Sequence, residues 1–257
     1  MATKAWGAEL AEHYDEGSSQ MFDPAVLGPT VDVLSELAWA GAEAGNAAWT
    51  QGGAGRALEF AVGTGRVALP LAERGVQVAG IELSPAMAEV LRAKPGAATV
   101  PVTVGDMTTT RVDGTFSLVY LVFNTIMNVT TQDEQVAVFE NAAAHLAQGG
   151  RFVVEVGVPM MAGLPATEPG RVFDLSPGHV GIDTHDDPVG QIISSHHWSL
   201  IDGAWAQSSA PFRYVWPSEL DLMARLAGLR LEHRWSGWDK SPFTAASTTQ
   251  IAVYLKP

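Results

Sequence analysis

Short apolar runs and amphipathic segments alternate along the middle of the chain, between residues 56 and 158. The apolar runs have the length and composition of buried strands, and most segments between them place apolar residues at helical spacing. The expected strands are 56–62, 76–82, 99–106, 116–124 and 151–158. Regular alternation of strands and helices predicts a parallel sheet with helices on both faces.

Local end signals define three of the expected helices. Asp23, Ser84 and Thr131 each precede an amphipathic segment, and their side chains are suited to accept hydrogen bonds from the first helical turn. The helices that they cap are expected at 24–44, 84–96 and 131–150.

The alternation stops after Pro159. Two strand-like runs flank Asp202–Gly203, a pair that predicts a hairpin turn. We therefore expect a β-rich lid at about residues 160–216, inserted within a single domain of residues 1–257. A helix at 218–228 and two strands, at 229–235 and 249–256, are expected to follow.

Composition narrows the classes of partner. Acidic residues outnumber basic residues by 28 to 15, so the formal net charge is −13 and we expect no nucleic acid partner. The chain has no cysteine, which excludes disulfides and thiolate metal sites. The contiguous His185–Asp187 triplet is interpreted as a solvated loop, so no metal is expected.

No apolar stretch is long enough to span a membrane and the N-terminus lacks an apolar signal core, which predicts a soluble, cytoplasmic protein without membrane contact.

A glycine turn follows the first expected strand, in the segment ALEFAVGTGR at 57–66. Gly63 to Ala68 fits the G-x-G-x-x-G/A pattern of dinucleotide-binding loops, and Glu82 ends the next strand, where such proteins bind a ribose. Ligands of parallel sheets lie beyond the carboxyl ends of the strands, so both features lie where a cofactor is expected. The pattern alone is weak, and on it an NAD(P)-linked oxidoreductase is one interpretation.

Glu59 favours a different cofactor. A carboxylate beside the glycine turn repels a pyrophosphate and attracts a cationic amino group. S-adenosylmethionine (SAM) carries a cationic amino group and a cationic sulfonium, and it has no phosphate. Glu82 is suited to accept hydrogen bonds from its ribose hydroxyls and Asp106 from its adenine amino group. Leu83 and Met107 offer apolar faces to the adenine ring.

Several motifs, taken in order, resemble those of class I SAM-dependent methyltransferases of the small-molecule branch. They are LEFAVGTGRVALPLAERG, VAGIELSPAMAEVLR, VGDM and LAQGGRFVVEV. The ending WPSELDLMARLAGL…TQIAVYLK resembles the last helix and antiparallel strand pair of that family, and AEHYDEG…MFDP resembles its N-terminal helix, which closes over the cofactor. The resemblance implies an α/β fold with a doubly wound seven-stranded mixed sheet, the last strand antiparallel, and helices on both faces.

The resemblance also implies a set of cofactor-binding residues. From the methionine end of SAM to its adenine, with the N-terminal tyrosine last, they are Glu59, Gly63, Gly65, Phe123, Asn124, Glu82, Leu83, Met87, Asp106, Met107 and Tyr14. Phe123 and Asn124 are expected near the sulfonium. The family usually has three alternating glycines after the acidic residue, and Ala61 replaces the first of them. A β conformation at Ala61 would tolerate the extra methyl group, whereas another conformation would weaken cofactor binding.

The implied reaction is an in-line transfer of the SAM methyl group to O or N of a small molecule, leaving S-adenosylhomocysteine (SAH). Orientation supplies much of the acceleration, so no catalytic residue is assigned. Aromatic residues of the lid and tail suggest an apolar pocket for the acceptor. Core packing is the simpler interpretation of each single residue. These residues are Phe173, Trp198, Trp205, Phe212, Tyr214, Trp216, Trp235 and Trp238. The neighbours His196 and His197 are expected on opposite faces of a strand. A non-catalytic SAM-binding protein is the second alternative, which Ala61 favours.

Overall fold

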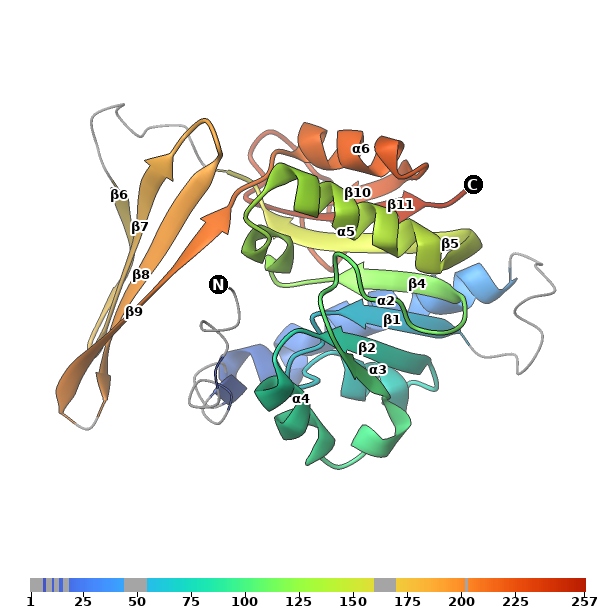
Figure 1. Cartoon of the computed structure of the whole chain (residues 1–257), viewed down its shortest axis with the longest axis horizontal. Helices are drawn as coiled ribbons and strands as arrows, with labels where there is room; N and C mark the ends of the chain where they lie inside the picture. The colour runs from blue at the N-terminus through green and yellow to red at the C-terminus, as the bar shows by residue number, and fades with distance from the viewer. Residues whose placement is uncertain are drawn as a thin grey trace.

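The computed structural model describes Gly7, Ala11, Tyr14, Asp15 and residues 19–43, 55–159, 170–201 and 203–257. Its main feature is a seven-stranded sheet (Figure 1). In spatial order the strands are β10 (Arg230–Trp235), β11 (Thr249–Leu255), β5 (Leu146–Gly157), β4 (Phe116–Leu121), β1 (Arg56–Phe60), β2 (Gln77–Glu82) and β3 (Val102–Val104). Strand β11 is antiparallel to both of its neighbours, whereas β5, β4, β1, β2 and β3 pair in parallel. This is the predicted mixed sheet.

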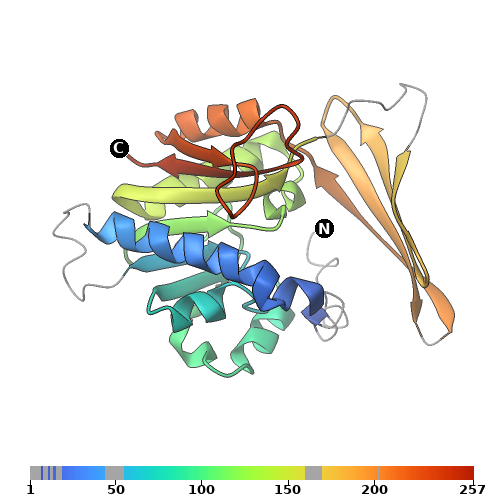
Figure 2. The ribbon, with the colours of Figure 1, turned by 180° about the vertical axis from the view of Figure 1, so that it is seen from behind.

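Helices cover both faces of this sheet, as predicted. One face carries α2 (Pro24–Glu43), α3 (Ala68–Glu73) and α4 (Pro85–Arg92), and the other carries α5 (Gln132–His145) and α6 (Pro217–Leu226). Figure 1 shows α5 and α6 in front of the sheet, and Figure 2 shows α2 in front when the molecule is turned round. Alternate residues of each buried strand pack into the two separate cores, because successive side chains in a strand point to opposite faces.

The predicted helix caps are confirmed. The N–H groups of Ala25, Met87 and Glu134 donate to the side chains of Asp23, Ser84 and Thr131, at 2.8, 3.3 and 3.3 Å respectively. Each bond satisfies an N–H group that has no partner within its own helix.

The expected end of the third capped helix is wrong. Helix α5 ends at His145, not at residue 150, because Leu146 is already extended and pairs with Phe116 as the first residue of β5. Gly149 then adopts a φ of +78° and donates its N–H to the carbonyl of Lys256 at 2.8 Å. Strand pairing with two segments that are distant in the sequence overrides the helical pattern here.

A second, antiparallel sheet lies between β5 and α6 in the sequence. Its strands, in spatial order, are β6 (Gly170–Ser176), β7 (His179–Asp187), β8 (Ile192–Ile201) and β9 (Ala204–Arg213). The β8–β9 pair confirms the predicted hairpin, although Asp202 itself lies outside the described residues. The other two strands were not expected, and the His185–Asp187 triplet lies in β7 rather than in a loop. The segment of β6 and β7 is rich in polar residues and half exposed, so it lacks the apolar run that marks a buried strand.

This second sheet stands beside the main sheet and meets it near the carboxyl ends of the parallel strands (Figures 1 and 2). Its principal contact with the main domain is between β9 and the short 3-10 helix η5 (Thr125–Asn128). Two further 3-10 turns are η2 (Ser19–Phe22) and η4 (Ala97–Thr99). Among the described helices, none is both long and apolar enough to cross a membrane.

Candidate functional site

A cavity of about 620 Å³ opens at the carboxyl ends of the parallel strands. Seven of the predicted cofactor-binding residues line it: Tyr14, Gly63, Glu82, Leu83, Met87, Asp106 and Met107. The structure thus brings together side chains that follow β1, β2 and β3 with one from the N-terminal segment. Its remaining lining residues include Asn128, Thr130 and Glu134, which follow β4, and Ala210 and Pro211 of β9. None of these five was predicted as a site residue.

The two glycines of the loop have different roles. Gly63, at a φ of +56°, faces open space, because a Cβ added there would meet nothing nearer than the carbonyl oxygen of Ala61 at 4.0 Å. Gly65, at a φ of +84°, does not line the cavity, and its added Cβ would lie 3.0 Å from Cγ of Leu91 and 3.2 Å from Cδ1 of Leu69. Gly63 therefore leaves room for a ligand, whereas Gly65 lets two helices pack against the loop.

Glu82 joins the glycine loop to the start of α4. Its carboxylate accepts hydrogen bonds from the N–H groups of Gly63 and Ser84, both at 2.8 Å. Burial raises the pKa of Glu82, and these N–H donors act against that shift by stabilising the ionised form. The carboxylate lies on the cavity wall at the end of β2, which is the position expected for a group that binds ribose hydroxyls.

Glu59 is buried beneath the loop rather than on the cavity wall. The Tyr120 hydroxyl donates to its carboxylate at 2.9 Å, from the adjacent strand β4. Burial raises the pKa of Glu59 to about 8, against the opposing effects of the Tyr120 hydrogen bond and the Arg66 charge.

Arg66 follows the glycine turn, and the sequence analysis gave it no role in binding. Its guanidinium carbon lies 5.1 Å from the centre of the Phe123 ring, within the range of a cation–π contact. Its positive charge acts to lower the pKa values of Glu59, Tyr14 and Tyr120. The basic residue directly after G-x-G was the available signal for this cation at the methionine end of the expected site.

Ala61 lines the cavity, but it is not in the β conformation that would accommodate its methyl group. Its φ is +54°, in the left-handed region that favours glycine. The cost of this conformation for an L-residue with a Cβ is about 1–2 kcal/mol. The replacement of the usual glycine is therefore strained.

Phe123 and Asn124 follow β4 and do not line the cavity. Both have a φ of +59°. The Asn124 side chain accepts a 2.6 Å hydrogen bond from the N–H of Gly157, at the end of β5. These residues border the glycine loop through the contact between Phe123 and Arg66.

The loop after β3, which carries Asp106 and Met107 on the cavity wall, is held in a defined conformation. The Asp106 carboxylate accepts from the N–H and the hydroxyl of Thr108, at 2.8 and 2.7 Å. The buried side chain of Asn141 donates to the carbonyl groups of Met107 and Thr110, at 2.6 and 3.0 Å. Helix α5 thereby fixes the backbone that presents Asp106 and Met107 to the cavity.

The N-terminal segment is fastened to the glycine loop next to Tyr14. The Thr64 hydroxyl donates to the Asp15 carboxylate at 2.6 Å, and Lys94 forms an ion pair with the same carboxylate. Lys94 also donates to the Thr64 carbonyl at 2.7 Å. These contacts hold Tyr14 against the cavity, where burial raises the pKa of its hydroxyl.

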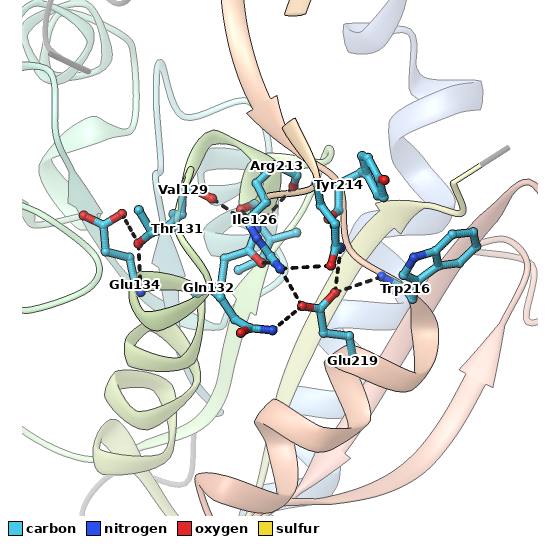
Figure 3. Close-up of polar contacts among 11 residues, drawn as sticks. Ile126, Val129, Thr131, Gln132, Glu134, Arg213, Tyr214, Trp216 and Glu219 are labelled. Atoms are coloured by element: carbon cyan, nitrogen blue, oxygen red, sulfur yellow. Dashed lines mark hydrogen bonds and ion pairs between the residues drawn. The ribbon is translucent and has the colours of Figure 1, made fainter. Parts of the chain in front are cut away.

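A buried polar network joins the base of the second sheet to the main domain (Figure 3). Arg213, at the end of β9, donates to Gln135, Gln191 and Glu219, at 2.5, 3.1 and 2.7 Å. Burial opposes ionisation of Glu219, but the donors Gln191, Arg213 and Gln132 together lower its pKa. The network connects β9 with α5 and α6, so it fixes the base of the second sheet beside the cavity.

The predicted aromatic acceptor pocket is not formed by this cavity, since none of the eight aromatic residues named for it is among the described lining residues. His196 and His197 do point to opposite faces of β8: His196 contacts Thr184 at 3.0 Å and His197 contacts His179 at 3.1 Å. Within the described parts of the chain, no group of three or more potential ligands is placed to hold a metal ion.

Comparisons with known proteins agree with this geometry. Residues 57–150 match a family described as a methyltransferase domain. The cypemycin N-terminal methyltransferase of a Streptomyces species is 29% identical over 247 residues, which cover 91% of this chain and 98% of that protein. The CcbJ methyltransferase from Streptomyces caelestis superposes with a TM-score of 0.70 at 35% identity, over 78% of this chain and 82% of that one. SAM-bound CalS10, an amino pentose methyltransferase from Micromonospora echinaspora, has the same fold, with a TM-score of 0.67 at 20% identity over 94% and 96% of the two chains.

Proposed function

Because the chain belongs to the family of class I SAM-dependent methyltransferases, we propose that the 620 Å³ cavity binds SAM together with a small amine whose nitrogen accepts the methyl group. The observation that carries the choice of acceptor is the charge of the cavity. Besides Glu82 and Asp106, which are assigned to SAM below, its wall holds the carboxylate of Glu134, and none of its described lining residues is Lys, Arg or His. Such a wall favours a cationic ligand over an anionic one.

The lining residues fit the parts of SAM in order. Glu82 would accept from the ribose hydroxyls and Asp106 from the adenine amino group, with the apolar side chains of Leu83, Met87 and Met107 around the ring. The open side of Gly63 leaves room for the methionine part. When bound, SAM supplies the electrophilic methyl group.

Two charges at the methionine end complement the zwitterionic amino acid of SAM. Buried Glu59 would stabilise the ammonium group, and Arg66, which lies among Glu59, Tyr14 and Phe123, would bind the carboxylate. Tyr14 would close this end, held by the contacts of Asp15 with Thr64 and Lys94.

The chain's role in the reaction is to orient and to exclude water. We propose that residues 160–216 form a lid inserted in a single domain, with Ala210 and Pro211 against the acceptor. To react, the amine must be neutral, with its nitrogen about 3 Å from the methyl carbon and in line with the bond between that carbon and the sulfur of SAM. Most of the acceleration of methyl transfer then comes from this orientation. The relative from a Streptomyces species methylates an N-terminus, as its name says, which supports an amine acceptor.

We also propose that the protein acts in the cytoplasm and without a nucleic acid partner. The absence of cysteine and the net charge of −13 support these two statements.

Calorimetric titration with SAM, SAH, NADH and NADPH tests the cofactor. We expect micromolar binding of SAM and SAH, lost in Glu82→Ala and retained in Glu73→Ala, an exposed control on α3. Binding of a nicotinamide cofactor in place of SAM would contradict the proposal. A panel of small amines and matching alcohols, followed by SAH release, then tests the acceptor, and turnover of the alcohols alone would overturn the amine assignment.

A further inference from the structure

Strand β9 is an open edge of the second sheet. Among the described residues it pairs with β8 alone, and Figure 1 shows it on the side of that sheet that faces the main domain. Residues 204–209 of this strand are all exposed. Their sequence, AWAQSS, has neither a charged residue nor a proline, the side chains that usually protect a sheet edge from further pairing. The edge is therefore available to an additional strand.

The hydrogen bonds at the end of β9 show which of its backbone groups are free. The N–H of Tyr214, directly after the strand, donates to the carbonyl of Gln191 at 3.0 Å, on the side of β8. The carbonyl of Arg213 faces the other way and accepts from the Gln135 side chain at 3.3 Å. The pairing of β8 with β9 has no register shift, so this alternation continues along the strand. The residues that direct N–H and C=O to the free edge are Trp205, Gln207 and Ser209.

The free edge leads to the cavity. Ala210 and Pro211, the next residues of β9, line it, and so does Thr125 of η5, the 3-10 helix that contacts β9. Pro211 has no N–H to donate, so pairing along the edge ends at Ser209, beside the cavity. From Trp205 to Ser209 the edge is about 14 Å long, at about 3.4 Å per residue. A strand of about five residues added there has one end at the cavity.

Charge determines which end of a peptide this is. Strand β9 runs toward the cavity, so an antiparallel peptide would bring its N-terminal amine there, and a parallel one its C-terminal carboxylate. Glu134 places a carboxylate on the wall, and the described lining residues include no Lys, Arg or His, which favours the amino end. The net charge of −13 disfavours a second copy of the chain as the occupant.

We propose that the methyl acceptor is the N-terminal amine of a short peptide, which extends from the cavity as a strand antiparallel to β9. This inference rests on the proposed function, since it names the class of amine. Backbone hydrogen bonds to the edge supply affinity without selecting side chains. The neutral terminal nitrogen would bond to the methyl carbon as the bond between that carbon and sulfur breaks, and it would then lose a proton to water.

Peptide length gives the first test. The full chain is assayed by SAH release with SAM and two amidated alanine–threonine peptides, a dipeptide and a heptapeptide. Only the heptapeptide is long enough to reach the edge, so we expect its kcat/KM to exceed that of the dipeptide at least about tenfold, through KM. Equal values for the two peptides would overturn the proposal.

Gln207→Pro tests the edge itself. It removes one free N–H and no bond to β8, which makes proline tolerable at this position of an edge strand. Gln207→Ala is the matched comparison, because it also removes the side chain but keeps the N–H. We expect the ratio of heptapeptide to dipeptide kcat/KM to be at least about fivefold lower in Gln207→Pro than in Gln207→Ala. The same ratio in both variants would contradict the proposal.

A peptide scan on the wild-type protein keeps the proposal testable if Gln207→Pro does not fold. Heptapeptides with a single backbone N-methyl group are compared, one position at a time. Only alternate residues of the added strand direct their N–H to β9, so KM should rise at least about fivefold at every second position and less than about twofold between them. A scan without this alternation would overturn the proposal.

Two further outcomes have distinct meanings. Sedimentation of the free protein as a dimer that Gln207→Pro dissociates would assign the edge to a second copy and overturn the peptide. Turnover of small amines without any advantage of the heptapeptide would contradict this inference alone. Failure to methylate any amine would contradict the proposed function and the inference with it.

Discussion

The Tyr120 hydroxyl donates a 2.9 Å hydrogen bond to the carboxylate of Glu59, and the two residues lie opposite each other in the parallel strands β4 and β1. Both are buried. The contact places a carboxylic acid below the glycine loop, with a pKa raised by burial to about 8. A group in this state is neutral in the free protein at neutral pH and gains from ionising when a cation binds beside it.

SAM affinity should therefore increase with pH. Binding of the SAM ammonium group favours the ionised form of Glu59, so below pH 8 binding releases a proton. The association constant should rise by up to about tenfold per pH unit between roughly pH 6 and 8, and level off above pH 8. Calorimetry in two buffers with different ionisation enthalpies measures the released proton.

Glu59→Gln is the control for this pH dependence. It should bind SAM more weakly at pH 8 and show a flat profile across the same range, because the titrating group is gone. A pH dependence that survives in this variant would assign the proton to another residue.

Ala61→Gly should stabilise the protein. The substitution relieves a left-handed conformation that costs about 1–2 kcal/mol. It also raises the conformational entropy of the unfolded chain, which opposes this gain by about 0.4–1 kcal/mol. The net gain expected is about 0.5–1 kcal/mol in the free energy of unfolding, measured by urea denaturation, together with an unchanged or tighter SAM constant. A loss of stability would show that the Ala61 methyl group makes compensating contacts.

Alanine substitutions at the two loop glycines should have opposite consequences. Gly63→Ala should fold and lose at least tenfold in SAM affinity, because its Cβ enters space that the cofactor needs. Gly65→Ala should instead lose about 1–3 kcal/mol of stability, because its Cβ meets Leu91 and Leu69. Thermal unfolding combined with SAM titration separates the two, and equal effects on both quantities would contradict the assignment.

Removing Arg213 should destabilise the base of the second sheet. Arg213→Met leaves the Glu219 carboxylate without its ion-pair partner, which costs about 3–5 kcal/mol for a buried pair and lowers Tm by roughly 6–20 °C. The double variant Arg213→Met, Glu219→Gln should recover part of this loss, since no charge remains unpaired. Differential scanning calorimetry makes the comparison, and an additive loss in the double variant would contradict the coupling.

The parallel strands and the helices of the main domain can be predicted from local patterns in the sequence, whereas its antiparallel strand pair was expected from the resemblance to the family. The apolar runs and the caps at Asp23, Ser84 and Thr131 depend on residues that are close in the chain, and the positions at which Glu82 and Asp106 follow their strands result from strand order. Local patterns suffice there, because hydrogen bonds within a helical turn and the two-residue period of a strand are short-range properties.

The other features depend on contacts between segments that are distant in the sequence. The end of α5 depends on pairing between Leu146 and Phe116, and the strands β6 and β7 depend on partners rather than on apolar runs. The conformation of Ala61 and the bonds from Glu155 to Phe123 and Trp238 join segments separated by many residues. No local pattern encodes which distant donor reaches a carboxylate, since that is set by the packing of the sheet and the paths of its loops.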